Sequence, residues 1–332
     1  MPVRSIVVTG ADVAVARRAI ALLHDDPDLA VVALGDPSPA ELAAVLAGAD
    51  TLVHLGWVDG GPRDPASARN VERTRRALDA AENATLSGLV LLSSATVYGA
   101  WPDNPVPLTE EAPLRPNPGV DDAIHHAEAE RLVAAWALDH PGVAVAVLRP
   151  ATMLGPGAGG WLVGALSDRG GVRPVRADPD RQFVHVDDVA SAVALAVRAR
   201  LDGVFNVAPA GAVAGEVVRE LSAWHPSLPL PGRAGPAVVE WAWDLGLSSL
   251  PPALLPLIED PWIVASDRLQ AEGWTPAYTS EEAIVAGRPP SRWREMSPGR
   301  RQSTALAASG VLAATVAAAI AVAVARARRR VS

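Results

Sequence analysis

The stretch Leu91-Leu92-Ser93-Ser94-Ala95-Thr96-Val97-Tyr98-Gly99 decides how this chain folds. An apolar run that ends in small hydroxyl residues and a glycine is typical of a buried strand that stops at a turn. Apolar runs of similar length recur on both sides of it, and stretches with helical character separate them. This alternation predicts an α/β fold with a parallel, doubly wound sheet, whose strands all end at the same edge.

The predicted elements follow one another from the N-terminus. Strands are expected at residues 5–9, 30–34, 51–55, 89–93 and 143–148, and helices at residues 13–23, 40–47, 67–81 and 123–138. Ligands of such sheets lie beyond the carboxyl ends of the strands. The turns after these strands should therefore line one crevice, and the residues expected around it are Gly10, Asp36, Leu55, Ser94 and Pro150.

Several motifs resemble those of one enzyme family, in the same order along the chain. The opening stretch resembles the active-site strand of the extended short-chain dehydrogenase/reductase family, the NAD-dependent epimerases and dehydratases. Similar matches occur at residues 50–56, 70–74, 148–157, 182–190 and 272–276. The resemblance covers residues 3–285. It implies a Rossmann-like dinucleotide-binding domain at residues 1–155 and a smaller substrate lobe at residues 156–285, interleaved with the sheet.

The first strand-to-helix turn keeps only part of the family's phosphate-binding pattern. The family reads Thr-Gly-x-x-Gly-x-x-Gly, and here the three glycine positions hold Gly10, Val13 and Ala16. The second glycine normally lets the pyrophosphate approach the backbone, and the third lets the helix pack closely. Val13 places a branched side chain at the phosphate position, and Asp12 adds negative charge at a helix N-terminus. The turn therefore predicts weak or absent dinucleotide binding.

Other cofactor positions are retained. Asp36 follows the second strand, where the family places an acid on the adenosine ribose and thereby prefers NAD to NADP. An ordinary turn aspartate before Pro37 is an equal alternative. The resemblance implies NAD or NADP as cofactor, with NAD favoured, and it implies cofactor contacts at Gly10, Asp36, Leu55, Gly56 and Pro150.

The catalytic helix departs most from the family. There a Tyr-x-x-x-Lys pair follows a Pro-rich loop, and the Lys lowers the pKa of the Tyr so that the phenol exchanges a proton while NAD exchanges a hydride. This chain contains no Lys, since all 29 of its basic residues are Arg. Anchoring the motif on Glu130 puts Asp122 at the Tyr position and His126 at the Lys position. Anchoring on Glu128 shifts the register by two, and no register supplies Tyr or Lys.

Asp122 and His126 have two interpretations. An Asp-x-x-x-His pair can do acid–base work because histidine titrates near neutral pH, and together with Ser94 it forms the candidate catalytic set. Such a pair cannot hold the phenolate that alcohol oxidation needs. In the second interpretation Asp121, Asp122, His125 and His126 form a solvated first turn, where the helix dipole favours the acids.

Composition limits the partners. The chain has 332 residues and no Cys, so disulfides and thiolate metal sites are excluded, and we predict no metal site. Its 37 acidic residues outnumber the 29 basic ones, and a formal charge of -8 argues against a nucleic-acid partner. The partner implied by the resemblance is a nucleotide-sugar or lipid-like small molecule. A homodimer is a further expected assembly.

The C-terminal end carries a different signal. Residues 305–325 contain no charge and lie between Arg300-Arg301 and an Arg-rich tail at residues 326–332. This length matches a helix that spans a bilayer. The alternatives are a buried or oligomerising Ala-rich helix, a loosely attached tail or an interfacial helix. We predict a basic linker at residues 286–302, a transmembrane helix at residues 303–325, and a single-pass protein of the cytoplasmic membrane whose soluble domain faces the cytoplasm.

Three functions are compatible with these motifs. The chain can be a pseudoenzyme that keeps the fold for sensing or for holding a partner at the membrane, or a nucleotide binder without hydride chemistry. It can also be an atypical NAD(P)-dependent epimerase or oxidoreductase that uses Ser94, Asp122 and His126 on a nucleotide sugar or lipid-like substrate. Because the cofactor turn and the catalytic pair have both changed, the sequence favours the first two.

Overall fold

Strands and helices alternate through the first half of the protein. A computed structural model describes residues 3–57, 68–158, 171–175, 178–221, 227–231, 235–245 and 250–287. Its first elements are β1 (Arg4–Thr9), α1 (Ala14–His24), β2 (Leu29–Leu34), α2 (Pro39–Leu46), β3 (Thr51–His54), α3 (Ala68–Ala81), β4 (Gly88–Leu92), α4 (Asp121–Asp139) and β5 (Ala144–Pro150). The predicted strands and helices are confirmed to within two residues at each end.

The central sheet has six strands in the order β2-β1-β3-β4-β5-β9, and β9 (Gly203–Val207) comes from the second half of the chain. Each neighbouring pair is parallel, which confirms the predicted doubly wound sheet. The chain moves from β1 to β2 on one side and then returns to place β3 on the other side. The strand order therefore reverses between β1 and β3, where such sheets bind ligands.

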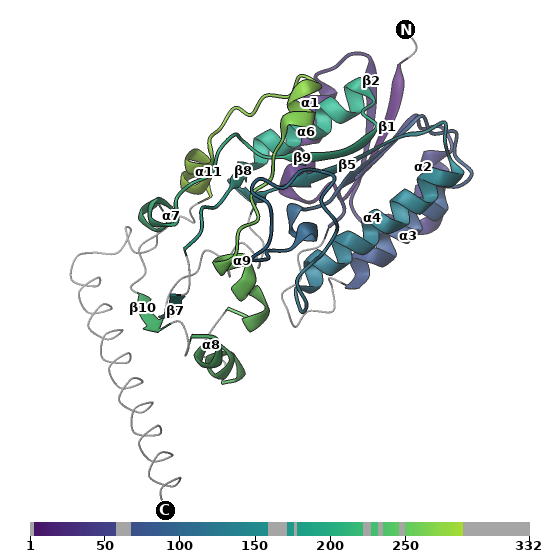
Figure 1. The fold of residues 1–332 in the computed structure, drawn as a ribbon. Coiled ribbons are helices and arrows are strands. Elements are labelled where there is room, and N and C mark those ends of the chain that lie inside the picture. The colour runs from purple at the N-terminus through teal and green to yellow at the C-terminus, as the bar shows by residue number, and fades with distance from the viewer. Residues whose placement is uncertain are drawn as a thin grey trace, which may run out of the picture. The chain divides into compact units, whose positions relative to one another are not determined.

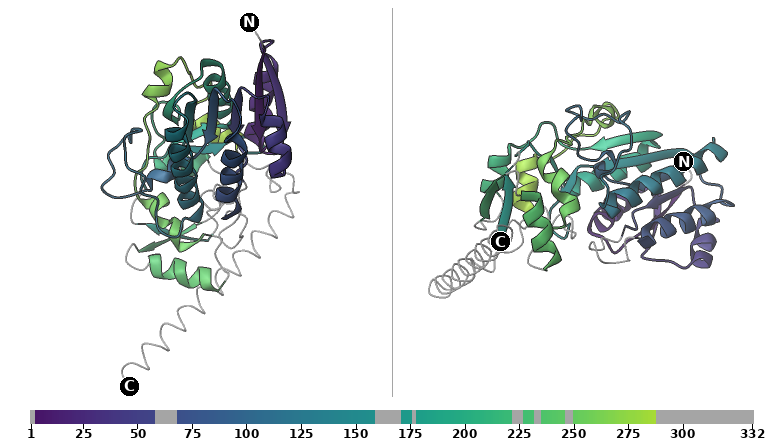
Figure 2. Two further views of the ribbon diagram at one scale, coloured as in Figure 1. Left: turned by 90° about the vertical axis from the view of Figure 1, so that its right-hand side faces the viewer. Right: turned by 60° about the horizontal axis from the view of Figure 1, so that its bottom comes forward.

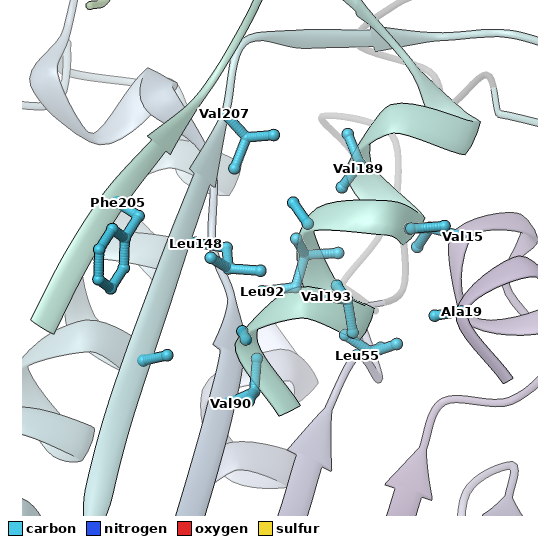
Figure 3. Packing of buried hydrophobic residues seen from close by; sticks show 14 of the residues in the cluster. Val15, Ala19, Leu55, Val90, Leu92, Leu148, Val189, Val193, Phe205 and Val207 are labelled. Carbon is cyan, nitrogen blue, oxygen red and sulfur yellow. The ribbon is translucent and has the colours of Figure 1, made fainter. Parts of the chain in front are cut away.

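Helices cover both faces of this sheet (Figure 1, Figure 2). Successive strand residues point to opposite faces, so Val7 joins the core beneath α2, α3 and α4, whereas Ile6 and Val8 join the core beneath α1 and α6 (Val186–Ala199). Figure 3 shows the second of these cores, in which Val189 and Val193 of α6 face strand residues such as Leu92 and Leu148. The inner strands β1, β3, β4 and β5 are buried from both sides, as parallel sheets require, whereas the edge strand β2 is more exposed.

The elements after residue 150 belong partly to the central sheet and partly to smaller pairs of strands and short helices. Two short parallel pairs form there, β6 (Thr152–Leu154) with β8 (Phe183–His185), and β7 (Gly171–Val175) with β10 (Ser227–Pro231). The remaining described elements are α7 (Gly215–Leu221), α8 (Gly235–Asp244), η2 (Pro252–Leu254), α9 (Leu255–Glu259), α10 (Asp267–Ala271) and α11 (Ser280–Ala286). Helix α6 packs on the sheet and β9 joins it, so residues after 150 also contribute to the sheet, and the predicted interleaved lobe stays a prediction.

The predicted transmembrane helix at residues 303–325 lies outside the described residues, as do the Arg-rich tail and the linker from residue 288 onward. Among the helices that the structure describes, none combines the length and apolar character needed to cross a membrane.

Candidate functional site

Gly10 fixes the close approach of two turns at the carboxyl edge of the sheet. Its φ is +78°, and a Cβ built on it would lie 2.3 Å from the Cα of Gly56. The turn after β1 therefore lies directly against the turn after β3, and the amide of Leu55 donates to the carbonyl of Thr9 at 3.1 Å. The glycine that survives from the family pattern is the one that these two backbones require.

The other two glycine positions of the phosphate-binding pattern hold residues that carry a side chain. Val13 is the N-cap of α1 with an extended backbone and no side-chain capping bond, and it packs against the core beneath α1 and α6. Ala16 is fully buried, so a methyl group fits at the third glycine position. The carboxylate of Asp12 lies over Gly35, where a Cβ would stand 2.6 Å from Asp12 Oδ2. The start of α1 thus has an acid beside it.

A hollow of about 90 Å³ opens at the carboxyl ends of β1, β2 and β3. The first turn, the segment after β2, the segment after β3 and one side of α3 each contribute to its wall. The lining residues are Thr9, Gly10, Asp12, Val13, Gly35, Asp36, Pro37, Pro39, Leu42, His54, Gly56, Trp57, Arg73, Arg76 and Ala77. The predicted residues Gly10, Asp36 and Gly56 meet here, whereas the side chain of Leu55 is buried in the core beneath α1 and α6.

Asp36 is held by an arginine from α3. Arg73 donates from Nε to Oδ1 at 3.1 Å and from NH2 to Oδ2 at 2.5 Å, which makes a two-pronged ion pair. The hydrogen bonds from Arg73 lower the pKa of Asp36, and the nearby Arg73, Arg76 and Arg69 charges act in the same direction. The acid that the resemblance assigns to a ribose is therefore bonded to a side chain of this chain.

His54 lines the hollow and connects the elements around it. Its Nδ1 lies 2.7 Å from the hydroxyl of Thr9, and its Nε2 lies 3.3 Å from the hydroxyl of Thr74. Burial lowers the pKa of His54 to about 4, with a smaller contribution from the Arg73 charge. The neutral imidazole therefore joins β1, β3 and α3.

Asp122 and His126 lie together on the first turns of α4. Both are buried, and Asp122 Oδ2 is 3.8 Å from His126 Nε2. Burial lowers the pKa of His126 despite the Asp122 and Glu130 charges, which act in the opposite direction. These are not residues of a solvated turn, so that interpretation is wrong for Asp122 and His126. The exposed neighbour Asp121 does fit it.

A tryptophan completes this cluster. The indole of Trp57, directly after Gly56, stacks on the imidazole of His126 with ring centroids 3.5 Å apart and planes 10° apart. Its Nε1 donates to Asp122 Oδ1 at 2.7 Å. The sequence reasoning missed Trp57, although its place at the end of a predicted strand put it at the edge where ligands bind.

Ser94 caps a short 3₁₀ turn, η1 (Ala95–Tyr98), at the end of β4. Its Oγ accepts hydrogen bonds from the hydroxyl of Thr96 at 2.9 Å and from the Thr96 amide at 3.3 Å. Ser94 is partly exposed, and its neighbour Ser93 is buried. The side chain at the predicted catalytic position is thus bonded to its own turn.

A buried polar network supports the site from below. Arg149 and Glu130 form an ion pair with contacts as short as 2.6 Å, and Ser93 donates to Glu130 at 2.5 Å. Arg149 also donates to the Tyr98 hydroxyl at 2.7 Å, and Tyr98 donates to Asn206 at 2.8 Å. Burial raises the pKa of Tyr98 to about 12, so the phenol stays protonated. Pro150 ends β5 beside this network and is buried.

The start of α6 is capped by a histidine, and the two acids that follow it bond to other elements. His185 is the N-cap, and its Nδ1 accepts from the Asp187 amide at 3.2 Å. Asp187 instead forms an ion pair with Arg18 of α1. Asp188 is buried and accepts from the amides of Ala277 and Tyr278 at 2.7 and 3.1 Å, while burial raises its pKa. These acids tie the start of α6 to its neighbours.

Comparison with known proteins gives a family match and several relatives. Residues 4–208 match the NAD dependent epimerase/dehydratase family. A 3-diazoavenalumate denitrifying reductase from a Streptomyces species is 33% identical over 223 residues, which cover 63% of this chain and 67% of that protein. An uncharacterized protein of Mycobacterium tuberculosis (strain ATCC 25618 / H37Rv) is 30% identical over 169 residues, which cover 49% of this chain and 44% of that protein. The chain thus matches less than half the length of the mycobacterial relative.

Two solved structures share the fold of this chain. The UDP-glucose 4-epimerase of Thermus thermophilus, solved with NAD, has a TM-score of 0.64 at 19% identity, covering 85% of this chain and 97% of that chain. RMD from Pseudomonas aeruginosa, solved with NADPH, has a TM-score of 0.63 at 22% identity with the same coverage. At such identities the likeness is one of fold.

Proposed function

Because the chain belongs to the NAD-dependent epimerase/dehydratase family, we propose that it binds a nucleotide in the crevice between β1 and β3 without performing the family's Tyr–Lys chemistry. NAD or NADP is the cofactor expected from the family, with NAD favoured, and its role when bound is to exchange a hydride. On the adenosine side, Gly10, Gly56 and Asp36 would contact it. Leu55 and Pro150 would contribute through the backbone around the crevice.

The packing of Asp122, His126 and Trp57 carries this proposal. A phenol that exchanges a proton near neutral pH needs a cation beside it, and the positions of that pair hold a carboxylate and an imidazole whose pKa is lowered by burial. Trp57 binds both side chains, at 2.7 Å from Asp122 and at 3.5 Å between its ring centroid and that of His126. This arrangement favours a pseudoenzyme or ligand-binding role over turnover.

Titration and turnover assays on the full chain test this function. We expect calorimetry to detect a nucleotide bound with modest affinity, and we expect no epimerised, dehydrated or oxidised product from UDP-glucose as the trial substrate. A nucleotide-dependent turnover that is lost in the variant His126→Ala, while the fold is kept, would establish the alternative, an enzyme that uses Ser94, Asp122 and His126. The variant His125→Ala, at the neighbouring partly exposed position, is the matched control.

A second candidate function is a reductase that transfers a hydride to an acceptor and does not need a tyrosine to supply a proton. The observation that favours it is the Streptomyces relative, which is named as a denitrifying reductase of a diazo compound. Replacing an aryl diazonium group by hydride releases N₂ and forms a C–H bond, so the acceptor carbon takes no proton from a Tyr–Lys pair. Consumption of NADH or NADPH with an aryl diazonium salt, with equal release of N₂, would support this candidate.

We also propose that residues 303–325 attach the protein to the cytoplasmic membrane in a single pass, with residues 1–300 on the cytoplasmic side. The support is an uncharged run at residues 305–325 between arginine clusters. A soluble domain at the membrane surface would suit a lipid-like ligand or a partner protein as well as a nucleotide sugar, the ligand class expected from the family.

A further inference from the structure

The two halves of the crevice differ in structure. A dinucleotide lies across the point where the strand order reverses, with one nucleotide on each side. Here the reversal falls between β1 and β3. The hollow lies on the β1–β2 side and extends to the end of β3. The other half lies over β3, β4 and β5, beside α4 with its Asp122 and His126.

The first half has the wall that a nucleoside phosphate needs. Pro37, Pro39 and Leu42 give it an apolar side, which suits a base. On the opposite side Gly10 and Gly56 bring the turns after β1 and β3 together beside the start of α1, where a helix N-terminus favours a phosphate. Two arginines of α3, Arg73 and Arg76, also line the hollow. Their positive charges balance the negative charges of the two aspartates there, Asp12 and Asp36.

Trp57 stands at the boundary between the two halves, because it lines the hollow and also contacts α4. Its backbone follows the end of β3, and its indole reaches α4, where it makes a face-to-face stack and a hydrogen bond. Both partners are nearly inaccessible, because Asp122 is 8% exposed and His126 is 6% exposed. The side chains that stand at the family's catalytic positions are therefore covered, and the indole of Trp57 contacts both of them.

We propose that the crevice recognises a nucleoside diphosphate, that it holds NAD through the ADP half alone, and that Trp57 is the residue that excludes the nicotinamide half. This inference rests on the proposed nucleotide binding and names the ligand class of the same site. The position of the Trp57 indole then explains why the Gly10 turn is retained while the catalytic pair is altered. The nucleotide site is kept where the hollow is open and is lost where the indole lies.

Calorimetric titrations of the full chain with ADP and with NAD test the inference. For the wild-type chain, we expect the two affinities to agree within about threefold, because the nicotinamide half adds no contacts. For Trp57→Ala, we expect the affinity for NAD to rise by about tenfold or more, whereas the affinity for ADP should change by no more than about threefold, because Trp57 lines only one edge of the hollow. The opened space then admits the second nucleotide.

A second tryptophan–histidine stack, which belongs to α4, provides a matched control. Trp136 stacks on His140 with ring centroids 3.9 Å apart, and its Nε1 donates to Glu82 at 3.2 Å. It thus repeats the tryptophan–histidine–acid arrangement at the other end of α4. We expect Trp136→Ala to leave the affinities for ADP and NAD unchanged. Thermal unfolding of each variant checks the fold, and Trp136→Phe replaces the control if the alanine variant does not fold.

The outcomes separate the two proposals. If ADP binds and Trp57→Ala leaves the affinity for NAD unchanged, the inference about Trp57 is wrong and nucleotide binding stands. A wild-type chain that binds NAD at least about tenfold more tightly than ADP would also overturn it. If neither ligand binds to the wild-type chain or to either variant, nucleotide binding itself fails, and the inference fails with it. If Trp57→Ala does not fold, Trp57→Leu removes the stack and takes its place.

Discussion

Gly10 is the residue on which the geometry of the crevice depends most directly. We predict that Gly10→Ala destabilises the fold by about 2 kcal/mol or more, because the added methyl group meets the Gly56 backbone and φ is +78°. Chemical denaturation measures this. Gly48→Ala is the matched control, since a Cβ there meets nothing within 4 Å. An equal effect of both substitutions would contradict the assigned close approach.

His54 should make stability depend on pH. Its pKa is lowered from 6.5 to about 4 in the folded chain, so between these values the unfolded chain binds the extra proton. Its contribution is therefore intact above pH 6.5 and is lost as the pH falls. We expect a loss of about 3 kcal/mol by pH 4, at about 1.4 kcal/mol for each pKa unit.

Comparison of variants isolates the His54 contribution from that of the carboxylates. Urea denaturation at pH 7 and pH 5 should show a smaller pH dependence for His54→Gln than for the wild-type chain. His24→Gln, at an exposed position on α1, should keep the wild-type dependence. If His54→Gln had the same pH dependence as the wild-type chain, His54 would be protonated in the folded state.

At the scale of the elements, α4 is held to the sheet by a buried ion pair. We predict that Glu130→Gln costs about 3–5 kcal/mol of unfolding free energy, because the Arg149 charge stays buried without its carboxylate. Glu128→Gln, on the same helix, removes only partly exposed contacts to Arg75 and Arg131 and should cost less than about 1 kcal/mol. Chemical denaturation of both variants decides, and equal costs would contradict the role of the pair.

The elements themselves could be predicted because their pattern is local. Alternating apolar runs and helical stretches place β1 to β5 and α1 to α4 to within two residues. Contacts between side chains far apart in the chain could not be predicted in this way. Trp57 and Asp122 lie 65 positions apart, and Asp36 and Arg73 lie 37 apart. The sequence identified Asp36, Asp122 and His126 as candidates, but their partners depend on how α3 and α4 pack on the sheet.

At the scale of the whole molecule, our proposal is that the C-terminal run determines where the protein is found in a cell. We predict that the full chain stays in the membrane fraction after washing with alkaline carbonate, because residues 305–325 are long enough to span the bilayer. A chain ending at residue 290 is the matched control and should be released. Release of the full chain by the same wash would mean that the run does not span.

Because Trp57 stacks on His126, its fluorescence should report on whether the crevice beside α4 is occupied. An indole that moves from a stacked, partly buried position into water emits at a longer wavelength. The emission of the wild-type chain minus that of Trp57→Phe would isolate this signal from the other nine tryptophans of the ten in the chain. A molecule that enters the crevice beside α4 and displaces the indole would then be detected as a shift in emission, without a label and without turnover.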